Sequence, residues 1–221
     1  MTAVTSPGPV EMSAGDDLVR VRWVMPEGFF ELPLDVETIE ELGDQLLDLA
    51  ARVLSEADFE LQAQWAAMCA ASYDFLVDAG VQYAGFVITE VDEVRCTANV
   101  QISLMDLPPQ AAPDPVGILA SALRDLDTGE VTEVRLPCGP AVTCVGARQA
   151  TVDGSLSESG SDEPFWTSFI QVQVPLPNAT VVVLEMTTPT QEGWDVFSSM
   201  FAGIVKSLRL YDVEGAPVKA A

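Results

Sequence analysis

Histidine is absent from this chain of 221 residues, and basic residues are few. Ten Lys and Arg stand against 34 Asp and Glu, which gives a formal net charge of −24 at pH 7. The lack of histidine excludes imidazole-based catalytic triads, histidine metal ligands and histidine pH switches. The lack of basic side chains argues against binding to nucleic acids or anionic membranes, because such partners need clustered Lys and Arg. Three roles stay open for the charge: solubility, docking of a basic partner, and mimicry of a polyanion.

Long hydrophobic runs are also missing. No stretch of eighteen apolar residues occurs, so no membrane-spanning helix is expected. The first 16 residues have neither the basic start nor the apolar core of a secretory signal, which favours a cytoplasmic protein. With 48% apolar and 20% charged residues, the composition is otherwise typical of a folded globular domain.

The cysteines show no CxxC pair and no zinc-binding spacing. They are Cys69, Cys96, Cys138 and Cys144. Cys138 and Cys144 flank a Gly-Pro bend, where a disulfide could form. In the cytoplasm both thiols are expected to be reduced. The sequence alone does not decide between the reduced and the bridged state.

Motifs for catalysis or cofactor binding are not found. The glycine-rich phosphate-binding motifs are missing, and neither Lys206 nor Lys219 is placed to activate a serine. Acids cluster at residues 90–93 and 158–163, but in no pattern typical of calcium or magnesium sites. We therefore expect no cofactor, no metal and no catalytic residues. A pair of carboxylates brought together in a cleft would escape detection in the sequence.

Two amphipathic patterns predict helices between residues 35 and 79. The first is expected to have Asp35 as its N-cap, and its apolar spacings of three and four indicate one buried face: Ile39, Leu42, Leu46, Leu49 and Val53. The second begins with Ser55 and Asp58 and ends at Gly80. Its expected inward residues are Leu61, Trp65, Met68, Ser72 and Leu76. Whether the two patterns form one bent helix or two helices stays open.

Alternation of apolar and polar residues predicts strands in the remainder of the chain. The expected strands span residues 19–25, 81–91, 94–105, 130–136, 141–152, 165–174 and 180–187. The strand at 94–105 alternates six times, which indicates one buried and one solvated face, as in antiparallel sheets. Asp114-Pro115 predicts the start of a further helix, and Thr188, Pro189 and Gln191 predict the N-cap region of the last one.

The order of these elements indicates an α+β fold. We expect a mostly antiparallel sheet of six to eight strands with helices packed against it, in an arrangement like an α/β/α sandwich. A single domain is predicted over residues 18–211, with a flexible leader at 1–17 and a flexible tail at 212–221.

The C-terminal block VQVPLPNATVVVLEMTTPTQEGWDVFSSMFAGIVKSLRL resembles the closing hairpin and helix of Mog1/PsbP-like α/β/α proteins, and DAGVQYAGFVI resembles a strand entry of small actinobacterial proteins of this type. The residues that carry the resemblance are Thr188, Pro189, Trp194, Phe201, Ile204, Ser207 and Leu208. The resemblance implies a non-enzymatic binding or accessory protein. It assigns no functional residues.

The leading interpretation is a non-catalytic cytoplasmic protein-interaction module with a strongly acidic surface, such as an adaptor, chaperone or assembly factor. Nine acids lie between residues 35 and 60 against Arg52 alone. The candidate face for a basic partner therefore lies on the first predicted helix: Glu37, Glu40, Glu41, Asp44 and Asp48.

Two other functions stay open. One is a small-molecule-binding protein or carboxylate-dependent enzyme with a cleft between sheet and helices. The other is an acidic inhibitor or mimic that binds a basic partner. Self-association through strand edges also stays open, whereas neither nucleic acid nor a membrane is expected as a partner.

Overall fold

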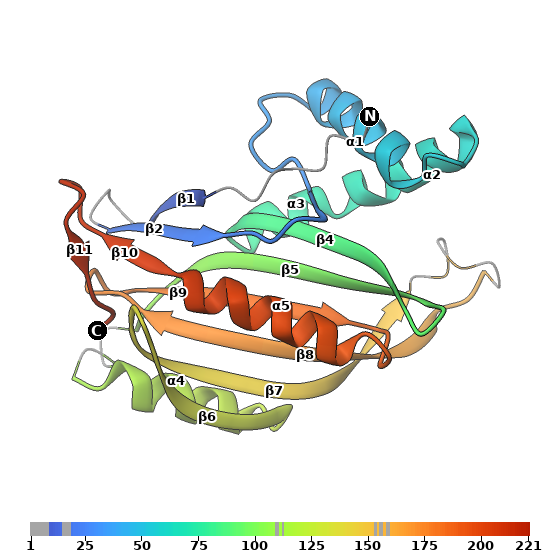
Figure 1. The fold of residues 1–221 in the computed structure, drawn as a ribbon. Helices are drawn as coiled ribbons and strands as arrows, with labels where there is room; N and C mark the ends of the chain where they lie inside the picture. The colour runs from blue at the N-terminus through green and yellow to red at the C-terminus, as the bar shows by residue number, and fades with distance from the viewer. Residues whose placement is uncertain are drawn as a thin grey trace.

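The computed structural model describes residues 9–14, 19–108, 111, 113–152, 154, 157 and 160–221. Within them, a seven-stranded antiparallel sheet with the order β3-β4-β5-β9-β8-β7-β6 forms the centre of the molecule (Figure 1). Its strands are β3 (Phe29–Glu31), β4 (Val81–Val91), β5 (Val94–Asp106), β6 (Gly129–Leu136), β7 (Gly139–Val152), β8 (Glu163–Pro175) and β9 (Thr180–Thr188). A four-stranded sheet contains β1 (Pro9–Ala14), β2 (Val19–Val24), β10 (Arg209–Tyr211) and β11 (Pro217–Val218).

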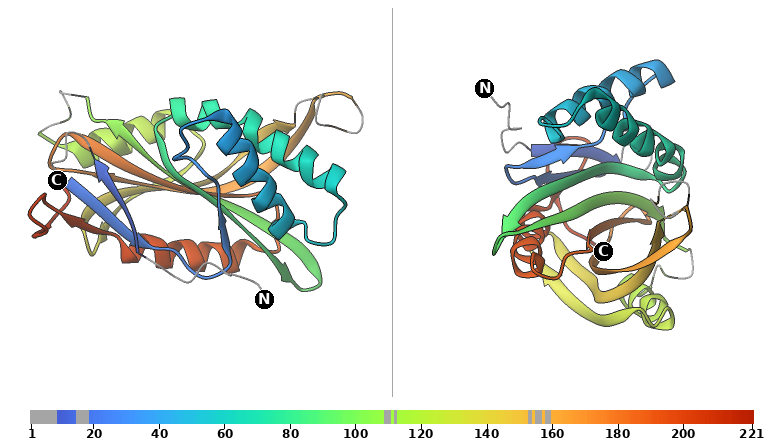
Figure 2. Two further views of the ribbon diagram at one scale, coloured as in Figure 1. Left: turned by 90° about the horizontal axis from the view of Figure 1, so that it is seen from above. Right: turned by 90° about the vertical axis from the view of Figure 1, so that its right-hand side faces the viewer.

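Helices lie on both faces of the large sheet (Figure 2). They are α1 (Ile39–Val53), α2 (Phe59–Ala71), α3 (Tyr73–Asp78), α4 (Pro115–Asp125) and α5 (Trp194–Ser207). Helix α5 and the small sheet cover one face. On the opposite face, α4 packs over β6, β7 and β8, and α1–α3 pack over β3 and β4. The predicted α+β fold class, with a mostly antiparallel sheet and helices packed against it, is confirmed.

The main core lies between the large sheet, α5 and the small sheet. Trp23 of β2 and Phe197 and Phe201 of α5 are almost fully buried there. They meet the alternate apolar residues of β5, such as Val100 and Ile102, which were expected to share one face. Asp92 and Glu93 have positive φ angles of 49° and 65°, which suits the two-residue turn that joins β4 to β5.

Two helix starts differ from the predicted ones. The N-cap of α1 is Thr38 and not Asp35: its hydroxyl accepts the Glu41 backbone N–H at 3.1 Å, and the Glu41 carboxylate accepts that of Glu37 at 3.2 Å. The arrangement is similar to a capping box, except that the Glu41 carboxylate accepts the N–H of the residue before the N-cap and not that of Thr38.

Helix α5 begins at Trp194 after Gly193, and not after Thr188. Thr188 remains in β9, where its hydroxyl donates to the Thr97 carbonyl of β5 at 2.7 Å and accepts the Thr190 N–H at 3.1 Å. Tertiary hydrogen bonding to the neighbouring strand therefore replaces the predicted capping role.

The segment after α1 contains two helices and not one. Asp58 caps α2 as predicted, with its carboxylate accepting the Leu61 N–H at 3.0 Å. Gly80 follows α3 with a φ of +69°, a left-handed conformation that ends the helix. The predicted inward face is wrong in most of its members, because Leu61 is 50% and Met68 40% exposed while Leu76 is buried.

Four strands were not predicted: β1, β3, β10 and β11. Strand β1 lies in the stretch expected as a flexible leader, where it pairs with β2, and β11 lies in the expected tail. Residues 1–8 and 15–18 lie outside the described residues. Strands β3, β10 and β11 have only two or three residues, too short for a periodic pattern to show in the sequence. Strand β1 has six residues, but it begins with Pro9 and contains small and polar residues that are typical of a loop.

Candidate functional site

Four of the five acids predicted as a binding face lie on the outer side of α1, and the fifth, Glu37, directly precedes its N-cap residue Thr38. Glu40, Asp44 and Asp48 are spaced by four residues, so they share one side of the helix, and all five acids are exposed. The buried residues Leu42 and Leu46 lie on the opposite side and pack towards α2 and the sheet. The spacing of the apolar and acidic residues therefore predicted the buried and the exposed face of this helix. The exception is Ile39, which was expected to be buried and is 69% exposed.

Not all five acids are equally free to meet a partner. Glu41 is engaged within the helix, because its carboxylate accepts hydrogen bonds from the Glu37 backbone and from the Gln45 side chain at 3.1 Å. The ion pairs between described residues join Glu11 to Arg20 and Arg22, Glu133 to Arg124, and Glu185 to Arg148. None involves α1, so Glu40, Asp44 and Asp48 present uncompensated charge.

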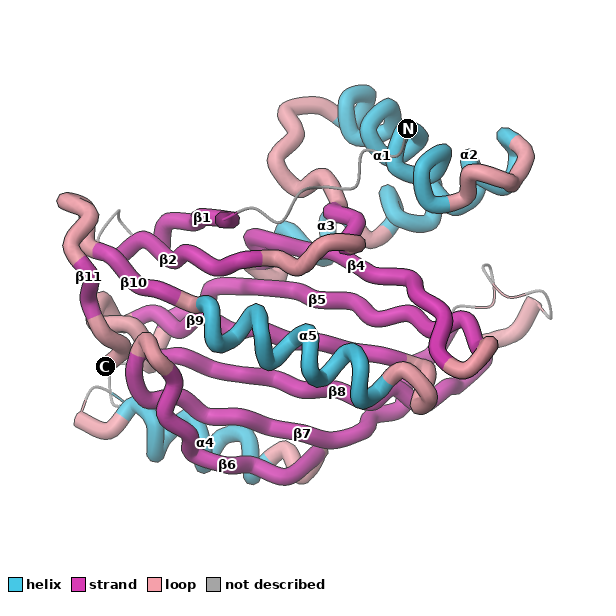
Figure 3. Tube along the Cα trace, viewed as in Figure 1, coloured by secondary structure: helices cyan, strands magenta, loops and turns pink. Residues whose placement is uncertain are grey.

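Helix α2 lies next to this acidic helix (Figure 3). Its exposed side chains include the apolar residues Phe59, Leu61 and Met68. A hollow of about 730 Å³ lies against it. We call this surface the α2 groove, and its lining residues are Leu54, Leu61, Gln64, Trp65, Ala67, Met68 and Ala71. They lie on the side of α2 away from Ala66, which is buried against α1.

Trp65 fixes the inner edge of the α2 groove. Its ring contacts Phe86 of β4 at 5.7 Å between centroids, and Phe86 stacks on Phe30 of β3 at 5.4 Å. These contacts explain why Phe86 points to the sheet face opposite Val87: helix α2 covers it. The outer residues of the α2 groove have no such cover among the described residues.

A smaller pair of hollows surrounds Glu31 at the end of β3. They measure about 310 and 490 Å³, and Leu32, Leu34 and Asp35 line both of them. Burial raises the pKa of the Glu31 carboxyl. Burial, and to a smaller degree the charge of Glu31, raises the pKa of the Tyr83 hydroxyl in the larger hollow.

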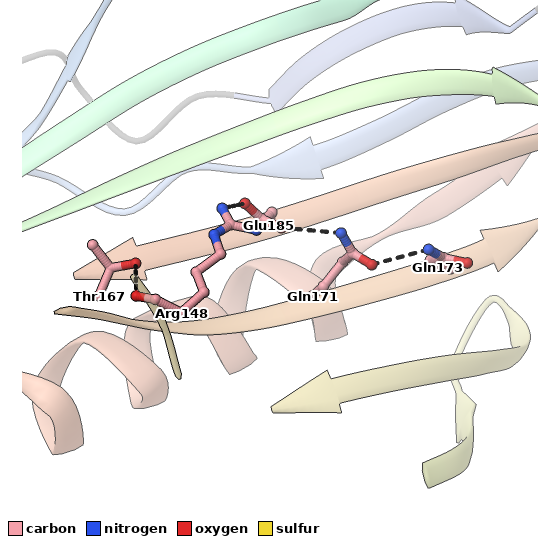
Figure 4. A network of polar contacts seen from close by, with 5 residues as sticks. All are labelled: Arg148, Thr167, Gln171, Gln173 and Glu185. Atoms are coloured by element: carbon pink, nitrogen blue, oxygen red, sulfur yellow. Dashed lines mark hydrogen bonds and ion pairs between the residues drawn. The ribbon is translucent and has the colours of Figure 1, made fainter. Parts of the chain in front are cut away.

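A row of polar side chains crosses the large sheet (Figure 4). It lies on the sheet face against which α4 packs. The Arg148 guanidinium donates to both carboxylate oxygens of Glu185, at 2.5 and 3.3 Å. The Gln171 amide donates to Glu185 at 3.0 Å, and Gln173 donates to Gln171 at 2.9 Å. The row satisfies its own members across β7, β8 and β9, so it supports the sheet.

The thiols give no indication of nucleophilic chemistry. All four cysteines are free, so Cys138 and Cys144 are not bridged. Burial raises the pKa of Cys69 to about 11, and it also raises the pKa of Cys138 and of Cys144. A reactive cysteine needs the opposite shift.

No metal centre or membrane helix emerges from the described part of the chain. None of its clusters of three or more Cys, Asp and Glu side chains could hold a metal ion. Of the helices described, none is long and apolar enough to cross a membrane.

The α2 groove was not predicted from the sequence, although the sequence of α2 contains a signal for it. Helix α2 (FELQAQWAAMCAA) has a single charged residue, Glu60, and apolar residues on every side. Such a helix normally lies in the interior of a protein. Here the interior covers only one side of it, which the sequence does not reveal.

The fold and the surface define an α+β protein with an antiparallel sheet between helical layers, one of them acidic outside and apolar beneath. No family model matches the sequence, and no curated protein matches it either. Similar solved structures include LpqN, involved in cell envelope biogenesis of Mycobacterium tuberculosis, with 12% identity, a TM-score of 0.40 and coverage of 92% of this chain and 90% of that chain.

A cyanobacterial PsbP (CyanoP) from Synechocystis sp. PCC 6803 is also similar, with 11% identity and a TM-score of 0.34. It covers 96% of this chain and 97% of its own. The resemblance to PsbP-like proteins that the sequence indicated is therefore found in the structural comparison as well. It concerns the fold alone.

Proposed function

We propose that this protein is a non-catalytic protein-interaction module that binds a basic partner through the helical layer α1–α3. The observation that carries the proposal is the outer face of α1, where Glu40, Asp44 and Asp48 are exposed and have no basic partner among the described residues. Arg52 is the only basic residue from Asp35 to Val94. A basic surface would therefore be attracted to this layer with little local repulsion.

A cytoplasmic location is part of the same proposal. The four free cysteines support it, because extracellular proteins more often form disulfides. The resemblance to PsbP-like proteins, which was noted in the sequence, also implies a binding role and not a catalytic one.

The test compares two variants with equal net charge. One variant neutralises the α1 face with Glu40→Gln, Asp44→Asn and Asp48→Asn, and leaves Glu41 in its capping role. The control neutralises three exposed acids elsewhere: Glu90→Gln, Glu130→Gln and Glu192→Gln. Proteins captured from cells by the immobilised wild type are identified, purified and titrated against all three chains.

A purified partner should bind the wild type and the control variant similarly, and should bind the α1 variant at least tenfold more weakly at low salt. The binding should also weaken as salt rises, because screening shortens the range of the attraction. A purified partner that binds the wild type and the α1 variant with equal affinity would contradict the proposed role of this face.

A further inference from the structure

We infer that the α2 groove binds an amphipathic α-helix of a partner protein, with apolar residues against α2 and Lys or Arg along its margins. This inference rests on the proposed function and names the chemistry of the partner. The first observation is exposure: Leu61 and Met68 are 50% and 40% exposed, and no element of the described residues covers them. Contiguous exposed apolar surface is one of the features of interaction sites.

The shape of the groove favours a helix over a small molecule. All of its described lining residues come from α2 and the turn before it, between Leu54 and Ala71. A small ligand is normally enclosed by several elements that bury most of its surface. A surface made by a single helix matches instead the packing of a second helix along it.

The spacing of the lining residues agrees with helix packing. Leu61, Trp65 and Met68 follow one another at intervals of four and three residues, which places them in one stripe. Ala67 and Ala71 form a row of small side chains beside that stripe. Large side chains of a partner helix can pack over these small side chains, so the backbone of the partner helix can approach α2 closely.

The charge around the groove selects the kind of helix. Glu60 lies one turn before Gln64, in the row that continues to Ala67 and Ala71, and Glu56 and Asp58 lie in and next to the turn before α2. The chain has no basic residue between Arg52 and Arg95. An apolar helix flanked by Lys or Arg therefore matches this surface in both its apolar and its charged parts.

The same charge disfavours the other occupants. In a symmetric pair of chains, the acids beside the groove would meet their own copies and repel each other. An anionic membrane would be repelled for the same reason. The structure thus points to a basic partner helix and not to a second copy or a lipid surface.

The test uses a fluorescent peptide of about 18 residues in which Leu occupies one helical stripe and Lys the remaining positions. Two further peptides serve as references: one with the same composition in scrambled order, and one with Glu in place of Lys. Binding to the full chain is measured by fluorescence anisotropy at about 150 mM salt. The groove variant carries Leu61→Ser and Met68→Ser, and the control variant carries Leu126→Ser, at a leucine that is 65% exposed after α4.

The Leu/Lys peptide should bind the wild type and the Leu126→Ser variant equally, and the groove variant roughly tenfold more weakly because two apolar anchors are lost. The scrambled and the Leu/Glu peptides should bind at least tenfold more weakly than the Leu/Lys peptide. Circular dichroism of both variants confirms that they are folded.

Three outcomes would overturn the inference: no binding of the Leu/Lys peptide, equal binding to the wild type and the groove variant, or equal binding of the scrambled peptide. If the wild type forms a dimer in sedimentation and the groove variant does not, the occupant of the groove is a second copy, and the inference is overturned.

The α1 variant separates the two proposals. If binding falls in the α1 variant and not in the groove variant, the acidic face is retained as the binding site and the helix groove is rejected. The reverse result rejects the role of the α1 face.

Discussion

At the scale of single residues, Glu31 is an exposed carboxylate that its neighbours partly desolvate. It ends β3 between two hollows, and burial raises its pKa. A raised pKa means that the folded protein holds the proton of Glu31 more tightly than the unfolded chain does. Ionised Glu31 therefore costs a small amount of stability at neutral pH, because solvent still reaches the side chain. The cost disappears where the side chain is protonated in both states.

We predict that Glu31→Gln raises the melting temperature at pH 7. The gain should shrink as the pH falls through the raised pKa of Glu31, and it should vanish below the usual pKa of glutamate, near 4.5. Thermal unfolding followed by circular dichroism between pH 4 and pH 8 measures it. Glu27→Gln, at an exposed turn residue, removes the same charge and serves as the control. A gain that is equal in both variants, or independent of pH, would contradict the role of burial at Glu31.

At the scale of elements, α1 and α2 show two different relations between pattern and packing. In α1, the apolar stripe at spacings of three and four is the buried stripe, with Leu46 only 2% exposed. In α2, apolar residues occur on every side, so the pattern cannot say which side faces inward. The structure selects the side of Ala66 against α1 and leaves Met68 in the groove.

Because of this difference, two substitutions that each shorten an apolar side chain should change the free energy of unfolding by very different amounts. Leu46→Ala should lower the free energy of unfolding by about 2–5 kcal/mol, because it leaves a cavity in a packed interface. Met68→Ser should change it by no more than about 0.5 kcal/mol, because this side chain is 40% exposed. Urea denaturation of both variants checks the prediction. A loss of more than about 2 kcal/mol for Met68→Ser would show that the α2 groove is part of the folded core.

The last helix shows where local signals fail. In the sequence, the last helix has a typical N-cap signal at Thr188, Pro189 and Gln191. In the structure, Thr188 instead remains in β9, where it donates a hydrogen bond to the carbonyl of Thr97, 91 residues away in the chain. The hydrogen bonds of Thr38 and Glu41 at the start of α1 lie within residues 37–41. The sequence contains that local pattern, although Asp35 was predicted as the N-cap, whereas nothing near Thr188 in the sequence indicates its bond to a distant strand.

At the scale of the whole molecule, the charge of −24 acts against the compact state. Ion pairs between described residues engage only a few of the 34 acids, and all of these pairs lie on strands or at the end of α4. Most of the negative charge is therefore balanced by solvent ions and not by the protein. Folding concentrates these like charges on one compact surface.

We predict that the melting temperature rises with salt. From about 0.01 M to 0.15 M NaCl the screening length falls from roughly 30 to 8 Å, which reduces repulsion between the acids. Each 1 kcal/mol recovered should raise the melting temperature by roughly 2–4 °C in a chain of this size. Differential scanning calorimetry in NaCl and in KCl measures the effect and controls for binding of a particular cation. A melting temperature that is flat or falls over this range would contradict dominant self-repulsion.

The sequence alone determined the fold class, the strands of the large sheet from β4 to β9, the buried stripe of α1 and the exclusion of histidine chemistry. These features depend on composition and on periodicities that repeat over eight or more residues. The tertiary structure decided the short strands, the start of α5, the free state of Cys138 and Cys144, and the outward side of α2. Each of these depends on which distant segment lies next to it, and no local pattern records that.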